Sequence, residues 1–548
     1  MPTVTHRPPP EVWSFDDRRA DLAGCSPNIA ECLLRAGEPG RTALCTIDQN
    51  HTYAQLRQST AAIALWLARS GASPGDRAVL VGDNSLYWVA AYLGSIHAGL
   101  VSVPLPPSTN REDLEYALQT TGARIVFADA GFGWKHRATL EGCHLVTDRP
   151  LPATAVRSCH SFPKICDSAS HHPAPPSVGG GGDLAALMFT SGSTGRPRGV
   201  MVSHKNIAAN TRSIVQYLEL TAADSIMTVL PFHYCFGTSL LHTHLAVGGT
   251  LVIEPRFMYP EVVLQRMIDT GCTGFAGVPS HFQLLLRRSS LKHKRFPALR
   301  YVQQAGGHLP PSSVLELCNA LPDTRIFVMY GQTEATARLS YLPPELIASK
   351  PGSIGRGIPG VTLRVLDESG NPVRPGEVGE IVAEGDNVAS GYWDAPDETA
   401  AVFRNGQLHT GDLATVDDEG FIFVSGRSKD FLKCAGKRVS CRQLEELVLR
   451  LDSVLEAAIV PIPDDVLGDA VKLFVVPRDP SADGFLARLH EHCRCTMLPP
   501  TVPREIVVLE ALPKNPAGKV LKERLNAASG NGTVPQVDSA EKGDWHAL

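Results

Sequence analysis

The sequence contains no run of lysines and arginines, and its 51 basic and 56 acidic residues leave a net charge of only -5. A basic patch or tail is the usual sign of a nucleic-acid-binding protein, so we expect no nucleic-acid partner. The first ten residues are rich in proline and have no apolar core of the kind that a signal peptide needs. These absences favour a cytoplasmic protein.

The 13 cysteines form no regular framework. Neither Cys493 with Cys495 nor Cys434 with Cys441 has the paired spacing and the histidine partners of a zinc site. Scattered cysteines without such a pattern are typical of reduced thiols in the cytoplasm. We therefore expect neither disulfides nor a structural zinc ion.

Formally charged residues are missing between Asn84 and Asn110, a stretch long enough to be mistaken for a membrane span. However, His97, Gly99, Pro104 and several serines interrupt it, and a spanning helix would tolerate them poorly as a set. A helix followed by a buried strand fits the pattern better. We expect no membrane span.

Helical and strand patterns alternate along the first part of the chain, which is typical of an α/β fold with a largely parallel sheet. A chain of 548 residues is also too long for one core and predicts two to four units. The expected elements are helices at 53–70, 85–97 and 111–121, and strands at 78–81, 100–104 and 123–128. Residues 149–182 lose this periodicity and are expected to be a surface connection.

A loop of small residues follows a predicted buried strand at 184–189. It consists of Thr190, Ser191, Gly192, Ser193, Thr194 and Gly195, with Arg196 and Arg198 just beyond. Hydroxyls and backbone N–H groups on such a turn can cradle phosphate oxygens, and the arginines add positive charge. No Gly-Lys-Ser/Thr sequence closes the loop, so it is not a Walker phosphate loop. A flexible Ser/Gly linker is the alternative interpretation.

Two more loops follow predicted strands, at the edge where parallel sheets gather their ligands. The strand at 300–305 ends in Gly306, Gly307 and His308, and the strand at 325–329 ends in Tyr330, Gly331, Gln332, Thr333 and Glu334. In the second loop, Tyr330 offers an aromatic face to a purine and Thr333 a hydroxyl to phosphate. Glu334 offers a hard oxygen ligand to magnesium.

The later part of the chain changes character twice. Residues 355–360 match GxGxxG, but a strand pattern follows where a dinucleotide site requires a helix, so we expect no Rossmann site. Short strands and turns predict an antiparallel β-rich subdomain at 361–426. It contains Asp412, whose carboxylate can accept both hydroxyls of a ribose. After Lys429 a small α+β unit follows, and near its end Lys519 comes after a loop of proline and glycine.

These motifs occur in the order in which they occur in the adenylate-forming superfamily, and the chain resembles that family from about residue 50 to 525. The family includes acyl-CoA synthetases, the adenylation domains of peptide synthetases and firefly luciferase. The resemblance implies a large α/β N-terminal domain at 21–428, with the β-rich subdomain at about 361–426. It also implies a small, mobile α+β lid at 429–527 that is hinged at Lys429. Residues 1–20 and 528–548 are expected to be disordered.

The resemblance also implies a reaction in two steps. A carboxylic acid attacks the α-phosphate of ATP to give an acyl-adenylate and pyrophosphate, and a thiol then displaces AMP to give a thioester. The implied cofactors are ATP, magnesium and coenzyme A, and the phosphopantetheine of an acyl carrier protein is the alternative thiol. A binding-only protein with this fold would lack Glu334 and Lys519, and both are present.

Residue roles carry over from the family as expectations. Lys519 is the cation that bridges carboxylate, α-phosphate and ribose, and Arg427 joins Asp412 at the ribose. Gly306 and Gly307 lie against the adenine. For the thiol step, Lys433 and the glycine turn Ala435-Gly436 line the tunnel. The phosphate loop departs from the family because Arg198 stands where most relatives have lysine, which keeps the charge but changes its geometry.

The aromatic segment His233, Tyr234, Cys235 and Phe236 is expected to border the acid pocket, with His233 as its gate and Phe282 and Gln303 as further contacts. Relatives that activate amino acids commonly place an aspartate at the position of Cys235. No carboxylate lies between Pro231 and Thr250, so an α-ammonium group would be buried without its usual partner. The sequence therefore predicts an apolar or aromatic acid as substrate.

Overall fold

The computed structural model describes residues 28–152, 156, 158–190, 197–427, 431–434, 437–464, 468–479, 484–514 and 520–527. The chain divides into two compact units. The first takes the described residues up to Ile226 together with Gly237–Ile253 and Ile358–Gly360, and the second takes Met227–Phe236, Glu254–Gly357 and the residues from Val361 onward. The predicted disordered ends and the predicted boundary at 428/429 lie outside the described residues.

The first unit is built on a seven-stranded sheet of order β7-β6-β5-β3-β4-β8-β9. Its strands pair in parallel as far as β8, and β9 runs antiparallel to β8. This confirms the largely parallel sheet that the alternating pattern predicts. The strands are β3 (Arg77–Val81), β4 (Val101–Leu105), β5 (Ile125–Ala128), β6 (His144–Thr147), β7 (Cys159–Ser161), β8 (Leu184–Thr190) and β9 (Arg198–Ser203).

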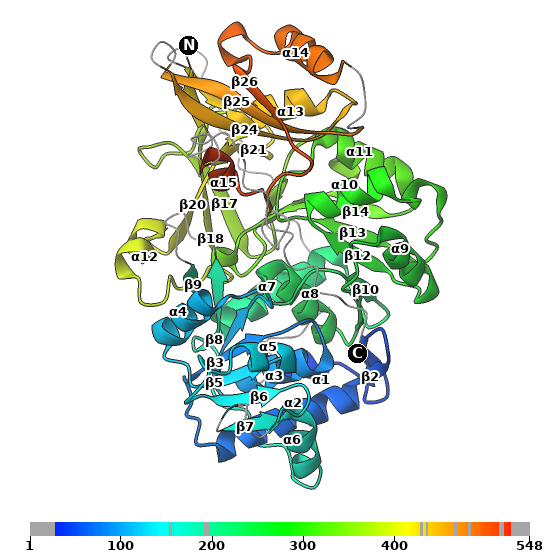
Figure 1. Cartoon of the computed structure of the whole chain (residues 1–548), viewed down its shortest axis with the longest axis vertical. Coiled ribbons are helices and arrows are strands. Elements are labelled where there is room, and N and C mark those ends of the chain that lie inside the picture. The colour runs from blue at the N-terminus through cyan, green and yellow to red at the C-terminus, as the bar shows by residue number, and fades with distance from the viewer. Residues whose placement is uncertain are drawn as a thin grey trace, which may run out of the picture. The chain divides into compact units, whose positions relative to one another are not determined.

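The helices of this unit include the three expected from the periodicity, within two residues at each end. Among them, α2 packs against both α3 and α6 (Figure 1). The helices are α1 (Ile29–Arg35), α2 (Tyr53–Arg69), α3 (Leu86–His97), α4 (Arg111–Thr121), α5 (Ala130–Lys135), α6 (Phe162–Ala169) and α7 (His204–Leu218). A further helix, α8 (Cys235–Ala246), spans the division between the units.

The charge-free stretch forms α3 followed by β4, as predicted. Ser85 caps the helix by accepting a hydrogen bond from Trp88 N, and ten of its residues, from Tyr87 to Ile96, are buried. An uncharged helix follows from burial on all sides. Within the part of the chain that the structure describes, no helix is both long and apolar enough to cross a bilayer.

The expected irregular connection at 149–182 is wrong in its middle, because β7 and α6 form there. Helix α6 has only 8 residues and buries only Ile165 among its apolar positions. A helix of two turns is too short for its apolar periodicity to stand out in the longer windows that sequence reasoning requires. The preceding strand, β7, has only three residues and is likewise too short to be predicted from its pattern.

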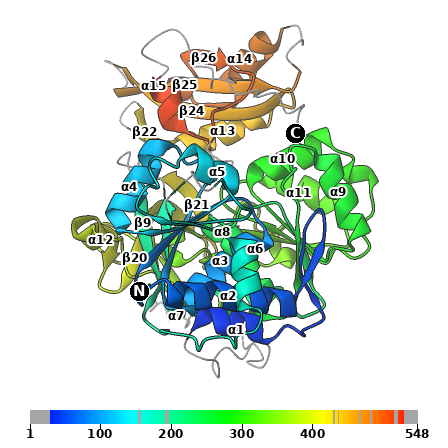
Figure 2. The same cartoon turned by 60° about the horizontal axis from the view of Figure 1, so that its bottom comes forward.

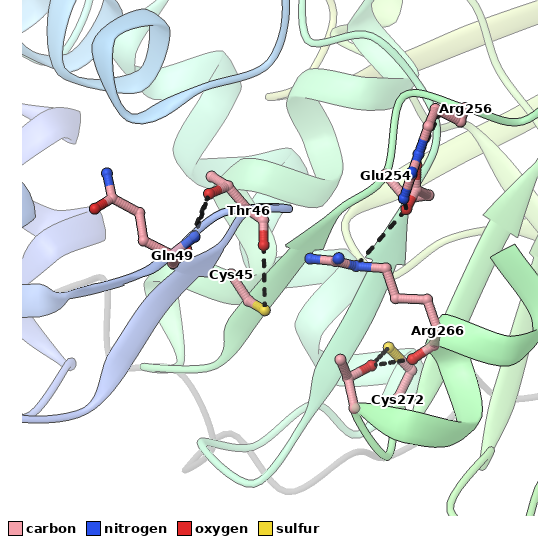
Figure 3. Close-up of polar contacts among 8 residues, drawn as sticks. Cys45, Thr46, Gln49, Glu254, Arg256, Arg266 and Cys272 are labelled. Atoms are coloured by element: carbon pink, nitrogen blue, oxygen red, sulfur yellow. Dashed lines mark hydrogen bonds and ion pairs between the residues drawn. The ribbon is translucent and has the colours of Figure 1, made fainter. Parts of the chain in front are cut away.

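Three strands outside the seven-stranded sheet also belong to the first unit. β1 (Thr42–Cys45) pairs in parallel with β11 (Thr250–Ile253) and antiparallel with β2 (Asn50–Thr52). In the β1–β2 turn, Thr46 Oγ1 donates to Gln49 O at 2.9 Å and accepts from Gln49 N at 3.3 Å (Figure 3). β10 (Ser225–Thr228) spans the division between the units.

The second unit contains three parallel strands followed by two antiparallel ones, in the order β12, β13, β14, β15, β16. The strands are β12 (Gly274–Gly277), β13 (Tyr301–Gln304), β14 (Arg325–Tyr330), β15 (Ser340–Leu342) and β16 (Arg356–Gly357). Three helices accompany them and lie next to one another (Figure 2): α9 (Pro260–Asp269), α10 (Pro279–Arg288) and α11 (Pro311–Ala320). The loops after β13 and β14 carry the predicted nucleotide residues.

The β-rich subdomain is an antiparallel sheet of order β17-β18-β20-β19, with β21 added to β20. Its strands are β17 (Val361–Leu366), β18 (Gly379–Gly385), β19 (Phe403–Arg404), β20 (Gln407–Val416) and β21 (Ile422–Arg427), and a short helix, α12 (Pro396–Val402), interrupts them. β17 directly follows the GxGxxG segment, which confirms that the segment is not a dinucleotide fingerprint.

The last sheet has the order β23-β22-β25-β24, and β26 pairs with β25. Alternate residues of the long hairpin β24–β25 (orange in Figure 1) pack into two separate cores. Ile459, Leu473 and Val475 pack with α13 and α14, whereas Ala458, Phe474 and Val476 pack with Leu525 of α15. The elements are β22 (Phe431–Cys434), β23 (Lys437–Ser440), α13 (Cys441–Leu449), β24 (Val454–Asp464), β25 (Gly468–Pro477), α14 (Phe485–Thr496), β26 (Glu505–Val508) and α15 (Lys522–Ala527).

Candidate active site

The loop after β13 is shaped by glycine. Gly306 has a φ of +81°, and a Cβ there would lie 2.9 Å from Val278 Cγ1, so both backbone and space require glycine. Gln304 closes the turn, because its Nε2 donates to Gly307 O at 2.9 Å. The loop therefore presents backbone rather than side chain where the adenine is expected.

The loop after β14 brings two predicted site residues into contact. Tyr330 O–H donates to Asp412 Oδ2 at 2.6 Å, across 82 residues of sequence. At the next position, a Cβ on Gly331 would lie 2.0 Å from Ala337 O, so no other residue fits without moving backbone. Asp412 itself is held in register in β20, where its N–H donates to Thr410 Oγ1 at 3.2 Å. The aromatic ring and the carboxylate thus form one fixed group.

A cavity of about 220 Å³ lies between these loops. Its lining includes the predicted nucleotide residues Gly306, Gly307, His308, Tyr330, Gly331 and Asp412. A Cβ on Gly307 would lie 3.2 Å from Pro279 Cγ, a tight contact that favours glycine at this position. An aromatic wall, a glycine floor and a carboxylate suit an adenosine.

The residues after Gly331 are also held by long-range contacts. Tyr392 O–H donates to Glu334 Oε1 at 2.9 Å, and Ala389 N donates to Glu334 O at 2.9 Å. Thr333 Oγ1 lies 3.4 Å from Cys235 Sγ. Among the described residues no three His, Cys, Asp or Glu side chains gather as a metal cluster. A single oriented carboxylate fits Mg²⁺, which binds few protein ligands and keeps phosphate and water as the others.

The aromatic segment expected to border the acid pocket leads into α8, which begins at Cys235. His233 is buried, its ring centroid lies 4.4 Å from that of Tyr234, and burial lowers the pKa of its imidazole to about 4. The side chain is therefore neutral near pH 7. Its Nε2 has no hydrogen-bond partner among the described residues, which leaves a buried polar atom at the predicted gate.

A buried arginine, which sequence reasoning missed, lies beside this segment. Arg338 is only 1% exposed, and its guanidinium carbon lies 4.7 Å from the centroid of the Phe236 ring. Its Nη2 lies 3.4 Å from Gln303 Oε1. The positive charge of Arg338 also lowers the pKa of the Cys235 thiol, against the stronger raising effect of burial. A cation thus lies close to the position where amino-acid-activating relatives place an aspartate.

Not every predicted pocket residue is brought to this cluster. Phe282 is fully buried in α10, with its ring edge-on to Phe275 at 5.8 Å between centroids, which is the packing of a core residue. Its role as an acid contact stays a prediction. Arg338 and Tyr392 give no local signal, because the partners that define them lie 35 to 102 residues away along the chain.

The predicted catalytic lysine and most of the predicted phosphate loop lie outside the described residues. Ser191, Gly192, Ser193, Thr194, Gly195, Lys429, Ala435, Gly436 and Lys519 lie outside the described residues, as do the side chains of Arg427 and Lys433. The two ends of the phosphate loop are described, and Thr190 and Arg198 are paired across β8 and β9. β8 and β9 are therefore antiparallel neighbours, and the roles of the residues between them stay predictions.

Comparison with known proteins places these features in one family. The model of the AMP-binding enzyme family matches residues 35–393, and that of the AMP-binding enzyme C-terminal domain matches residues 443–519. A feruloyl-CoA synthase from Amycolatopsis sp is 32% identical over 486 residues, which cover 87% of this chain and 94% of the relative. A long-chain-fatty-acid–CoA ligase from Salmonella typhimurium is 29% identical over 94% of this chain and 98% of its own length. The ATP-bound structure of MatB from Rhodopseudomonas palustris superposes with a TM-score of 0.82 at 26% identity, covering 92% of this chain and 99% of that one.

Proposed function

The chain belongs to the AMP-binding enzyme family and is an AMP-forming acid–thiol ligase, and on that premise we propose how its residues carry out the reaction and which acids it takes. The enzyme activates a carboxylic acid as an acyl-adenylate and transfers the acyl group to the thiol of CoA. The observation that carries the proposal is the cavity in which Tyr330, Asp412 and the glycines of the β13 loop meet.

In this proposal the cavity holds the adenosine of ATP. The adenine lies on the backbone of Gly306 and Gly307 and against the ring of Tyr330. Asp412 accepts hydrogen bonds from the ribose hydroxyls, and the phenol of Tyr330 keeps its carboxylate oriented. Because both side chains are already held by the fold, little conformational freedom is lost when the nucleotide binds.

Glu334 is the residue that would hold Mg²⁺, and the Tyr392 hydroxyl fixes its carboxylate for that purpose. When bound, the ion neutralises phosphate charge as the anionic acid approaches ATP. The hydroxyls of Thr190 and Thr333 and the guanidinium of Arg198 would assist with the phosphates. Lys519 would complete this neutralisation as the cation near carboxylate and α-phosphate, since positioning and charge stabilisation dominate such a step.

The thiol step would follow after a rotation of the C-terminal residues about Lys429. Lys433 and the Ala435-Gly436 turn would then line the path of the pantetheine arm. The thiol attacks the acyl carbon, the bond from that carbon to the adenylate oxygen breaks, and AMP leaves. One active site serves both half-reactions in this way.

The acid we propose is apolar or aromatic and carries no α-ammonium group. Such a group would meet the Cys235 thiol and, close by, the buried cation of Arg338, where a carboxylate would be needed. The neutral imidazole of His233 and the rings of Tyr234 and Phe236 favour an uncharged acyl group.

The test measures thioester release with ATP and Mg²⁺ across fatty, benzoic and cinnamic acids of graded size, beside the twenty amino acids. CoA and a pantetheinylated acyl carrier protein are compared as acceptors. We expect ATP-dependent acyl-CoA formation, with release of AMP, from plain acids and none from amino acids. Thioester formation with α-amino acids alone would contradict the substrate class, and turnover with the carrier protein alone would contradict the acceptor.

A further inference from the structure

A three-residue contact joins the adenine loop to the first turns of α13. Arg442 and Glu446, one turn apart on that helix, both reach His308 of the loop after β13. Arg442 Nη2 donates to His308 Nδ1, and His308 Nε2 lies 2.7 Å from Glu446 Oε1. The third side is the pair Arg442 Nε and Glu446 Oε1, at 3.4 Å.

The direction of these contacts is set by their chemistry. A guanidinium can only donate, so His308 Nδ1 must accept and must carry no proton. The proton of the neutral imidazole is then on Nε2, where it faces the carboxylate of Glu446. Arg442 thus donates to His308, and the carboxylate of Glu446 lies beside both side chains, 2.7 Å from His308 Nε2 and 3.4 Å from Arg442 Nε.

Helix α13 is itself firmly placed. Ser440 caps it by accepting from Gln443 N at 3.4 Å, and the Ser440 hydroxyl also donates to Ser425 O of β21. Leu444 and Val448 are buried in the core formed with β24 and β25. The opposite edge of the helix carries Arg442, so its guanidinium is presented at a defined position.

That position is the wall of the nucleotide cavity, which Arg442 lines together with Gly307, Tyr330 and Asp412. The Arg442 side chain is only 15% exposed, and burial lowers the pKa of its guanidinium while Glu446 opposes that effect. A charged group is costly to keep in such surroundings. A guanidinium carries five N–H donors, and this one lines a cavity that suits an adenosine. Arg442 is therefore placed to donate hydrogen bonds to a bound nucleotide.

We propose that Arg442 is a nucleotide-positioning residue, held by His308 and Glu446, through which α13 contributes directly to the binding of adenine nucleotides. The inference rests on the proposed function, since it takes the cavity as the adenosine site. Arg442 donates to acceptors of the adenosine, and the contacts with His308 and Glu446 keep its guanidinium aimed into the cavity. Nucleotide affinity therefore depends on α13 being docked.

The experiment measures AMP binding to the full-length protein by titration calorimetry, and the KM values for ATP and for the acid by pyrophosphate exchange. Arg442→Ala is expected to weaken AMP binding by about tenfold or more, as for the loss of a hydrogen bond from a charged donor. The KM for ATP should rise with it, whereas the KM for the acid should not change. Arg450→Ala, which changes an exposed arginine at the C-terminal end of the same helix, is the matched control. Arg442→Gln replaces Arg442→Ala if the latter does not fold.

Substitutions of His308 test whether it positions Arg442 or only supports the fold. His308→Gln provides one acceptor and one donor, as the neutral imidazole does, and should retain most of the affinity, whereas His308→Leu should lose it. The His308→Leu, Arg442→Ala double variant should bind AMP no more weakly than Arg442→Ala alone. Wild-type affinity in Arg442→Ala, or losses that add in the double variant, would overturn the inference. Absence of AMP binding by the wild-type protein would instead contradict the proposed nucleotide cavity.

Discussion

His204, the first residue of α7, should make the protein less stable in acid, because its neutral imidazole is buried where α1 packs on α7. Ile29 N, at the start of α1, donates to His204 Nδ1 at 3.0 Å, so this nitrogen must be unprotonated. His204 is 2% exposed, and burial lowers its pKa to about 4, with a smaller opposing effect of Asp183. Protonation would require both a buried charge and the loss of the hydrogen bond.

The size of the stability loss follows from the difference between the pKa of His204 in the unfolded chain and its pKa in the folded chain. The imidazole has a pKa of 6.5 in the unfolded chain and about 4 in the folded one. At ~1.4 kcal/mol for each unit of difference, the cost reaches about 3 kcal/mol. Because the folded pKa is the lower one, the unfolded chain binds the extra proton between pH 6.5 and 4. Stability therefore falls as pH falls through that range, and the contribution of His204 is constant below it.

The assay compares urea denaturation of the wild type and His204→Asn at pH 7, 6, 5 and 4.5, followed by tryptophan fluorescence and by circular dichroism. The asparagine Oδ1 keeps an acceptor for Ile29 N but does not titrate. We expect the variant to be less stable at pH 7 and to lose distinctly less stability on acidification. His172→Asn, at an exposed position, controls for the substitution itself. Equal acid losses in His204→Asn and wild type would refute the reasoning.

Three further predictions concern a buried carboxylate and the proposed catalytic groups. Glu254→Gln should lower the free energy of unfolding by about 3 kcal/mol, measured by thermal or urea denaturation. The reason is that the fully buried carboxylate of Glu254 accepts from Arg256 Nε at 2.7 Å and from Arg256 Nη2 at 2.8 Å (Figure 3). Glu115→Gln, which removes a carboxylate from an exposed ion pair, should change the stability little. Tyr392→Phe removes the hydrogen bond to Glu334 and should raise the Mg²⁺ concentration needed for half-maximal activity, and an unchanged requirement would speak against Glu334 as the ligand. Lys519→Ala should abolish pyrophosphate exchange but spare transfer from preformed acyl-adenylate to CoA, and equal loss in both assays would mean that the lysine is structural.

Much of the architecture is readable from local patterns. The helix at 111–121 and the strand at 78–81 are found within one residue of their predicted bounds, because apolar periodicity and the turn residues around them act within a few positions. The order of motifs likewise predicts a nucleotide role for the loops after β13 and β14. What sequence cannot reveal is which side chains meet. Tyr330 and Asp412 are both predicted, yet their hydrogen bond depends on two different sheets.

The residues that were missed share one physical reason. Arg338 is an ordinary charged residue in sequence and becomes unusual only when Phe236 and Gln303 close around it. Arg442 lies 134 residues from His308, so neither shows its partner in any local window. Helix α6 was missed for a different reason: its apolar pattern is local, but the helix has only 8 residues and is too short to be recognised. The roles of Arg338 and Arg442 are set by burial and by contacts with residues far away in the sequence, and local secondary-structure propensity does not reveal them.

The central claim is that the oxygen of a carboxylic acid attacks the α-phosphate of ATP. The most direct measurement uses an accepted acid labelled with ¹⁸O in both carboxylate oxygens, with CoA present, and analyses the products by mass spectrometry. If an acyl-adenylate forms and the thiol then attacks its carbonyl carbon, AMP carries one ¹⁸O and pyrophosphate carries none. Label in inorganic phosphate together with ADP, or unlabelled AMP alongside the thioester, would contradict the account.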